Sequence, residues 1–132
     1  RSVTRTFLID QLNKKSENYD MILTGWLAGN LDPDSFMRPI LSCNSASEMT
    51  NLSNWCDEDF DQLMDKALDS PNLWERAHAY NQAQELILSK LPIVPLANMK
   101  RVLVVNSRVR HIEMNPFGSL NFSTLSLRKG EK

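Results

Sequence analysis

The chain is short of the features that mark several large classes of protein. It has only 4 glycines in 132 residues, and they are scattered, so it lacks a glycine-rich loop for a phosphate group. No apolar run approaches the roughly 18 residues that a membrane-spanning helix needs. The composition, 42% hydrophobic and 23% charged, excludes a disordered chain and is that of a soluble globular protein.

Groups that carry catalysis or bind metals are also scarce. His78 and His111 have no serine or cysteine beside them in a nucleophile setting. The acids at 57–61 lack the ligand spacing of a calcium loop and fit the first turn of a helix. Asp32 and Asp34 offer a carboxylate pair for hydrolysis, but their spacing across a proline is more typical of a turn. We expect neither a catalytic centre nor a metal site, and a hydrolase is the weaker alternative.

The chain has only 2 cysteines, Cys43 and Cys56. Their number does not suit a four-ligand zinc site, and their spacing is not that of a redox pair. A disulfide that closes the polar, turn-rich segment 44–51 is their best use, and it would stabilise the protein by about 3 kcal/mol. Such a bond indicates an oxidising compartment, whereas two free thiols in a cytosolic protein are the alternative.

Net charge is small, at −1, but it is unevenly distributed. Residues 1–98 hold 14 acids and 8 bases, a balance of −6, and residues 99–132 hold 2 acids and 7 bases, a balance of +5. We interpret this change as a boundary between two regions with different neighbours. The bases of the second region do not form one run and have no aromatic platform, so nucleic acid is not an expected partner.

Hydrophobic spacing predicts the order of the elements. A short helix over residues 3–12 precedes an apolar strand at 19–23, and one or two helical turns follow at 36–41. Two longer helices form a hairpin joined by the proline turn at 70–72. Their predicted apolar faces are Phe60, Leu63, Met64, Ala67 and Leu68, and then Leu73, Ala77, Tyr80, Gln84, Ile87 and Leu91.

Short β segments are predicted after the second helix, which must end near Leu91 because Pro92 has no amide donor. They cover residues 93–96, 102–105, 112–114 and 122–127. Helices followed by strands in this order suit an α/β or α+β layer architecture.

The segment 24–36 is the candidate functional loop. It leaves a buried strand and is rich in Gly, Asn, Asp and Pro, and irregular loops at strand ends are where α/β proteins usually bind ligands. Trp26 offers a ring for stacking on a ligand, while Gly25 and Gly29 allow close approach of the main chain. The alternative is that Trp26 is a core residue beside the apolar strand.

Several ordered motifs give the chain a resemblance to a known family. They are Tyr-Asp-Met-x-Leu-x-Gly-Trp (19–26), Asp-Pro-Asp-Ser-Phe (32–36), Ser-Cys (42–43), Asn-Trp-Cys-Asp (54–57), Phe-Asp-x-Leu (60–63), Arg-Ala-x-Ala-Tyr-Asn-Gln-Ala-Gln (76–84) and Leu-Pro-Ile-Val-Pro-Leu (91–96). In this order they resemble the C-terminal part of family 5 extracellular solute-binding proteins, the dipeptide and oligopeptide receptors of bacterial ABC importers.

The resemblance implies a fragment of an α/β, two-lobed periplasmic binding protein of the class II or cluster C type, with a mixed sheet and flanking helices. The start at Arg1, without an initiator methionine or signal segment, fits this expectation. Residues 1–98 would end the ligand-binding C-terminal lobe, and residues 99–132 would be the crossing strand and the segment that returns to the first lobe. The implied partners are a peptide, an inner-membrane ABC permease and the rest of the chain.

The resemblance also implies a Cys43–Cys56 disulfide, no enzymatic activity, no cofactor, and a ligand-binding loop. The ligand-binding residues that it implies are Thr24, Gly25, Trp26, Ala28, Gly29, Asn30 and Asp32. Asp32 matches an acidic residue whose role in the family is more structural than ligand-binding.

One position departs from the family pattern. In dipeptide and oligopeptide receptors the third residue after the conserved tryptophan is acidic and receives the peptide's amino group, but here it is Gly29. This departure argues against recognition of a free amine. The expected cargo widens to larger peptides, including cationic antimicrobial peptides, with haem or a polyanion as the alternative ligand.

Overall fold

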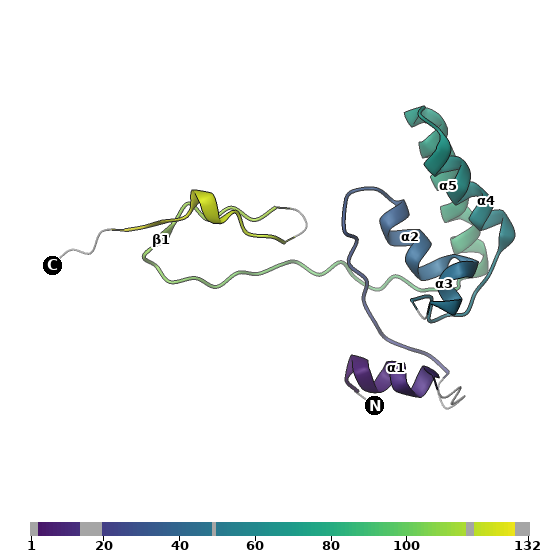
Figure 1. The fold of residues 1–132 in the computed structure, drawn as a ribbon, viewed down its shortest axis with the longest axis horizontal. Helices are drawn as coiled ribbons and strands as arrows, with labels where there is room; N and C mark the ends of the chain where they lie inside the picture. Colours follow the sequence, from purple (N-terminus) through teal and green to yellow (C-terminus); the bar gives the residue numbers. More distant parts are fainter. Residues whose placement is uncertain (1–2, 14–19, 49, 116–117, 129–132) are drawn as a thin grey trace. The chain divides into compact units, whose positions relative to one another are not determined.

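The computed structural model describes residues 3–13, 20–48, 50–115 and 118–128 (Figure 1). Contacts between residues divide the chain into two units, Arg1–Ile93 and Val94–Lys132, and each is described by itself. The predicted boundary after residue 98 stays a prediction.

The first unit is helical wherever the described residues have regular structure. The sequence predicted four of its five described helices, at 5–13, 34–41, 58–69 and 73–90, within a few residues of their ends. The helices are α1 (Arg5–Asn13), α2 (Asp34–Leu41), α3 (Cys43–Ser47), α4 (Glu58–Asp69) and α5 (Leu73–Lys90). The short α3 was not predicted, because its serine-rich and asparagine-rich sequence indicates turns rather than a helix.

Polar side chains fix where the helices begin. The Asp57 carboxylate accepts a hydrogen bond from the Phe60 amide (3.1 Å) at the start of α4, and the Asn72 side chain accepts one from the Trp74 amide (2.9 Å) at the start of α5. Helix α5 ends as predicted, with Leu91 in the left-handed conformation (φ 51°) directly before Pro92.

The hydrophobic core lies between α2, α4 and α5. In Figure 1 these helices, blue to green, lie together in the first unit. The buried residues are Met37 and Leu41 from α2, Phe60, Met64 and Ala67 from α4, and Ala79, Tyr80 and Ala83 from α5. Alanines at the contact let helix backbones approach closely, so α5 packs against α4 through small side chains.

The predicted apolar face of α5 is therefore wrong in part. Leu73 is 79% exposed, and Ala77 and Gln84 are also exposed, because the buried face is centred on alanines that the pattern of large residues did not pick out. On α4 the prediction is confirmed for Phe60, Met64 and Ala67, whereas Leu68 at the end of the face is 52% exposed.

The predicted strand at 19–23 is not formed by its described residues. Residues 21–28 have no regular structure, and Met21 and Leu23 are 90% and 84% exposed. Tyr19 lies outside the described residues. A strand needs a hydrogen-bonded neighbour, and none of the described segments pairs with this one.

The described residues of the second unit form one small antiparallel ribbon. Strand β1 (Val109–Arg110) pairs with β2 (Ser126–Leu127), with Val109 opposite Leu127. An isolated bridge joins Met114 to Leu120, and the 3₁₀ helix η1 (Phe122–Thr124) precedes β2. The predicted strands at 93–96 and 102–105 are wrong for this structure, and those at 112–114 and 122–127 are only partly formed. None of the described helices is long and apolar enough to cross a membrane.

The core assignment predicts a contrast between two positions on α4. Phe60→Ala removes a fully buried ring and should lower the free energy of unfolding by about 3–5 kcal/mol. Leu68→Ala, on the exposed edge, should cost less than about 1 kcal/mol. Urea unfolding of both variants tests this, and equal losses would contradict the core described above.

Candidate ligand-binding site

The loop expected to bind a ligand is extended and uncharged. Between residues 21 and 31 there is no ionisable side chain. Thr24, Gly25, Gly29 and Asn30 are exposed, while Trp26 and Ala28 are half-buried. A Cβ atom added at Gly29 would meet nothing within 4 Å, so packing does not require glycine there.

Trp26 is attached to α2 rather than to the hydrophobic core. Its indole Nε1–H donates a hydrogen bond to the Ser35 carbonyl oxygen (3.2 Å), and the residue is not part of the core cluster. The bond fixes the polar edge of the ring and leaves its faces for packing or stacking.

Asp32, at the end of the loop, is bound to its own fold by three donors. Its Oδ1 accepts hydrogen bonds from the Asp34 amide (3.0 Å) and the Tyr80 hydroxyl (2.8 Å), and its Oδ2 pairs with Arg76 Nη2 (2.5 Å). The Asp34 amide is the largest cause of a lowered pKa for the Asp32 carboxyl, and Tyr80 and Arg76 add to it against the effect of partial burial. The carboxylate is thus ionised and already paired.

Arg76 and Tyr80 were not among the predicted site residues. They lie one turn apart on α5, and the Arg76 guanidinium also donates to the Ala67 carbonyl oxygen at the end of α4 (2.8 Å). Burial, with the bond to Asp32, raises the pKa of Tyr80 to about 12. Their spacing of four residues places them on the same face of a helix, but nothing in the sequence pairs that face with Asp32.

The second carboxylate of the proposed hydrolytic pair faces a different partner. Asp34 pairs with Arg38 (2.7 Å), and Arg38 also pairs with Asp65 of α4 (2.8 Å). The carboxylates of Asp32 and Asp34 are therefore each engaged by their own arginine, which is not the shared-proton arrangement of a carboxylate dyad. In the part of the chain that the structure describes, no three His, Cys, Asp or Glu residues gather as a metal ion requires.

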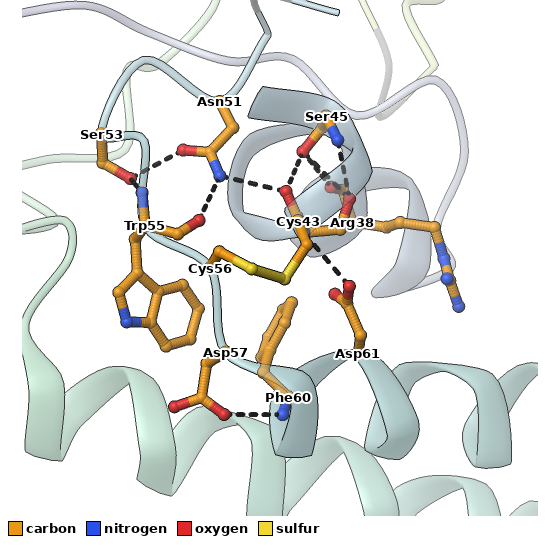
Figure 2. The surroundings of a disulfide bond; sticks show 11 residues. Arg38, Cys43, Ser45, Asn51, Ser53, Trp55, Cys56, Asp57, Phe60 and Asp61 are labelled. Carbon is orange, nitrogen blue, oxygen red and sulfur yellow. Dashed lines mark hydrogen bonds between the residues drawn. A yellow bond between two sulfur atoms is a disulfide. The ribbon is translucent and has the colours of Figure 1, made fainter. Parts of the chain in front are cut away.

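The predicted Cys43–Cys56 disulfide is present, with 4.4 Å between the Cα atoms (Figure 2). The disulfide joins Cys43, the first residue of α3, to Cys56, which directly precedes Asp57, the residue that caps α4. Asp61 on α4 accepts a hydrogen bond from the Cys43 amide (3.2 Å), and burial raises the pKa of its carboxyl. The crosslink and this bond hold α3 on α4.

Asn51 organises the loop that the disulfide closes, as Figure 2 shows. Its Nδ2 donates to the carbonyl oxygens of Ser42 (3.1 Å) and Trp55 (2.7 Å), and its Oδ1 accepts from Ser53 Oγ (2.7 Å). Asn51, Leu52 and Ser53 match the Asn-x-Ser pattern of a glycosylation acceptor, but Asn51 is 1% exposed and therefore inaccessible in the folded protein.

Comparison with known proteins finds relatives named for peptide transport and for di/tripeptide binding, although no family model matches this chain. It is 66% identical over 95% of its length to the peptide transport periplasmic protein SapA of Haemophilus influenzae. It is 39% identical over 87% of its length to the SapA protein of Salmonella typhimurium, and 40% identical over 86% to di/tripeptide-binding protein 4 of Pseudomonas aeruginosa. The chain spans about a fifth of each of these relatives (22%, 21% and 21%).

Solved structures agree with these relatives. The dipeptide-binding protein of Pseudoalteromonas sp. SM9913, in complex with Met-Leu, matches with a TM-score of 0.79 and 33% identity over 93% of this chain and 24% of its own. HbpA2 of Haemophilus parasuis matches with a TM-score of 0.56 and 32% identity over 80% of this chain and 21% of its own.

These likenesses confirm the resemblance found in the motifs. The chain is a homologue of the solute-binding proteins that serve peptide transport, and its fold is that of a segment of a two-lobed receptor. Within that class it is homologous to the SapA type, which the Pro-Phe-Gly-Ser-Leu-Asn-Phe stretch at 116–122 also favours. The predicted periplasmic location agrees with the names of these relatives, and those names describe transport and binding of peptides rather than a reaction.

The Tyr80 hydroxyl predicts a specific alkaline sensitivity. Because its pKa is raised from 10.0 to about 12, the neutral form stabilises the fold fully below pH 10, and that stability is lost as the pH rises to 12. Over this interval the free energy of unfolding should fall by on the order of 2–3 kcal/mol more in the wild type than in Tyr80→Phe. Urea unfolding at several pH values measures the difference, and parallel pH profiles would contradict it.

The disulfide predicts a loss of stability on reduction. Replacing both cysteines by serine should lower the free energy of unfolding by about 3 kcal/mol, because the unfolded loop is no longer closed. A reducing agent should lower the stability of the wild type by a similar amount and leave the double variant unchanged. Two alkylatable thiols in protein purified from an oxidising compartment would refute the bond.

Proposed function

We propose that this chain is part of the ligand-binding lobe of a periplasmic receptor that captures peptides and delivers them to an inner-membrane ABC permease. The observation that carries the proposal is the 66% identity, over 95% of the chain, to a peptide transport periplasmic protein. The structural likeness to a dipeptide receptor in complex with Met-Leu supports it.

The proposed ligand-contacting wall is the loop 24–30. Its members are Thr24, Gly25, Trp26, Ala28, Gly29 and Asn30, and they offer an aromatic ring, an amide and open main chain rather than charge. A peptide suits such a wall because its own amides can bond to exposed backbone while side chains occupy the space beside the glycines. Asp32 borders the wall, but its carboxylate is already paired.

The proposed receptor performs no covalent chemistry. A ligand that contacts two lobes at once stabilises the closed state relative to the open state, by its difference in affinity for the two. The closed, loaded receptor is then the form that the permease recognises. Any catalytic use of Asp32 and Asp34 would require release of the arginines that hold them.

Gly29 defines the class of peptide that we propose. A free ammonium group needs a nearby carboxylate to replace its hydration, and this wall has none that is unpaired. Peptides whose contacting part is uncharged, such as the interior of a longer chain, suit it better than free dipeptides. Antimicrobial peptides are long enough to present such an interior.

Calorimetry of the full-length receptor tests the function. We expect heat of binding with peptides and none with haem or nucleic acid, and the absence of heat with every peptide tried would overturn the proposal. Gly29→Asp should improve the affinity for free-amine dipeptides by about tenfold, because an ion pair becomes available where a side chain has room. Gly29→Asn is the matched control of equal size and should not show this gain.

A further inference from the structure

The loop 24–31 comprises the proposed ligand-contacting wall 24–30 and Leu31. It is fixed at both of its ends, although its middle makes few contacts. At one end the Trp26 indole donates to the Ser35 carbonyl oxygen (3.2 Å). At the other end Asp32 bonds to α5 through Tyr80 (2.8 Å) and Arg76 (2.5 Å). Leu27 and Leu31, between these two points, are 62% and 78% exposed.

Asp32 connects the loop to two helices at once. Its Oδ1 accepts from the Asp34 amide (3.0 Å) at the start of α2, and the same carboxylate is held by two side chains of α5. The Asp32 carbonyl oxygen also accepts from the Ser35 amide (3.1 Å) and from Ser35 Oγ (2.9 Å). A charge-assisted bond with this many partners sets the direction in which the chain enters α2.

Pro39 explains why a carbonyl is available to Trp26. Inside an α-helix the Ser35 carbonyl would accept from the amide of residue 39, but proline has no N–H to donate. A carbonyl left without its helical partner requires another donor, and the Trp26 indole is that donor. Pro39 therefore leaves the Ser35 carbonyl free to fix one end of the loop through Trp26, and Asp32 fixes the other end.

We propose that Asp32 and Pro39 are positioning residues that hold the peptide-contacting loop in its binding conformation, and that the Asp32 carboxylate is not a counter-ion for the ligand. This inference rests on the proposed function. Without the Asp32 and Trp26 contacts, the loop would adopt its peptide-binding conformation for only part of the time. The apparent affinity for peptide would be reduced to the same fraction.

The direct test measures peptide affinity in the full-length receptor. We use a lysine-containing tripeptide and the same tripeptide with its amino groups acetylated. Asp32→Asn should weaken both by the same factor, roughly tenfold, because the loop and not a ligand charge is affected. Loss of affinity for the charged tripeptide alone would overturn the proposal.

Arg76→Gln separates positioning from charge recognition by the sign of its effect. If Asp32 acts through Arg76, this variant weakens both tripeptides, and the double variant with Asp32→Asn is no weaker than either single variant. If Asp32 receives a ligand cation, removing Arg76 frees the carboxylate and tightens binding of the charged tripeptide. Asp65→Asn is the matched control: it breaks an aspartate–arginine pair away from the loop and should stay within about twofold of wild type.

Pro39→Ala distinguishes positioning from stability. An alanine inside α2 restores a backbone donor for Ser35 and should not lower the stability of the protein. Peptide affinity should nevertheless fall by a few-fold, because the new amide competes with the Trp26 indole for the same carbonyl. Unchanged affinity in this variant would refute the role of Pro39.

A measurement without ligand keeps the inference separate from the proposed function. In receptor labelled with ¹⁵N-tryptophan, the Trp26 indole signal is assigned with Trp26→Phe, and its hydrogen exchange is then followed. Both Asp32→Asn and Pro39→Ala should accelerate exchange, and wild-type rates in both would overturn the positioning role. If the wild type binds no peptide but exchange accelerates, the proposed function fails and the positioning role stands.

Discussion

The Arg76 guanidinium is the group on which the arrangement of the first unit depends. It donates to the Ala67 carbonyl oxygen, where α4 ends and its last carbonyls lack helical partners, and it pairs with Asp32, two residues before α2 begins. Its flat, forked shape allows both contacts at once, which a lysine ammonium cannot reproduce. The end of α4, helix α5 and the distant residue Asp32, 44 positions away in the sequence, therefore meet at one cation.

This arrangement separates the supporting helices from the loop that we propose for recognition. The helical hairpin of α4 and α5 supplies buried surface and fixed hydrogen-bond donors, and the disulfide with Asn51 holds the connection that precedes it. The loop 24–31 supplies no residue of the core cluster and no ionisable side chain. Binding residues on loops held by rigid elements are the usual solution in proteins.

Local signals in the sequence were sufficient for the helices but not for all of their contacts. Asp57 and Asn72 mark helix starts because capping is a contact within one turn, and the cysteines point to their bond because few other uses suit them. The buried face of α5 was misjudged because alanines contribute little to a hydrophobic pattern, although they decide how closely helices pack. The Asp32–Arg76 pair joins residues 44 positions apart, and no local pattern encodes such a contact.

The extended segments show the limit of local reasoning most clearly. Val102 and Val104 are more exposed than Leu103 and Val105, the period-two alternation of a strand with one covered face, yet the described residues at 102–105 form no strand. Residues 21–23 present the same case, with β-forming sequence and no hydrogen-bonded neighbour. A helix satisfies its backbone from its own residues, whereas a strand requires another segment to do so. The elements that the sequence predicts and the structure lacks are therefore those whose hydrogen bonds depend on a partner strand.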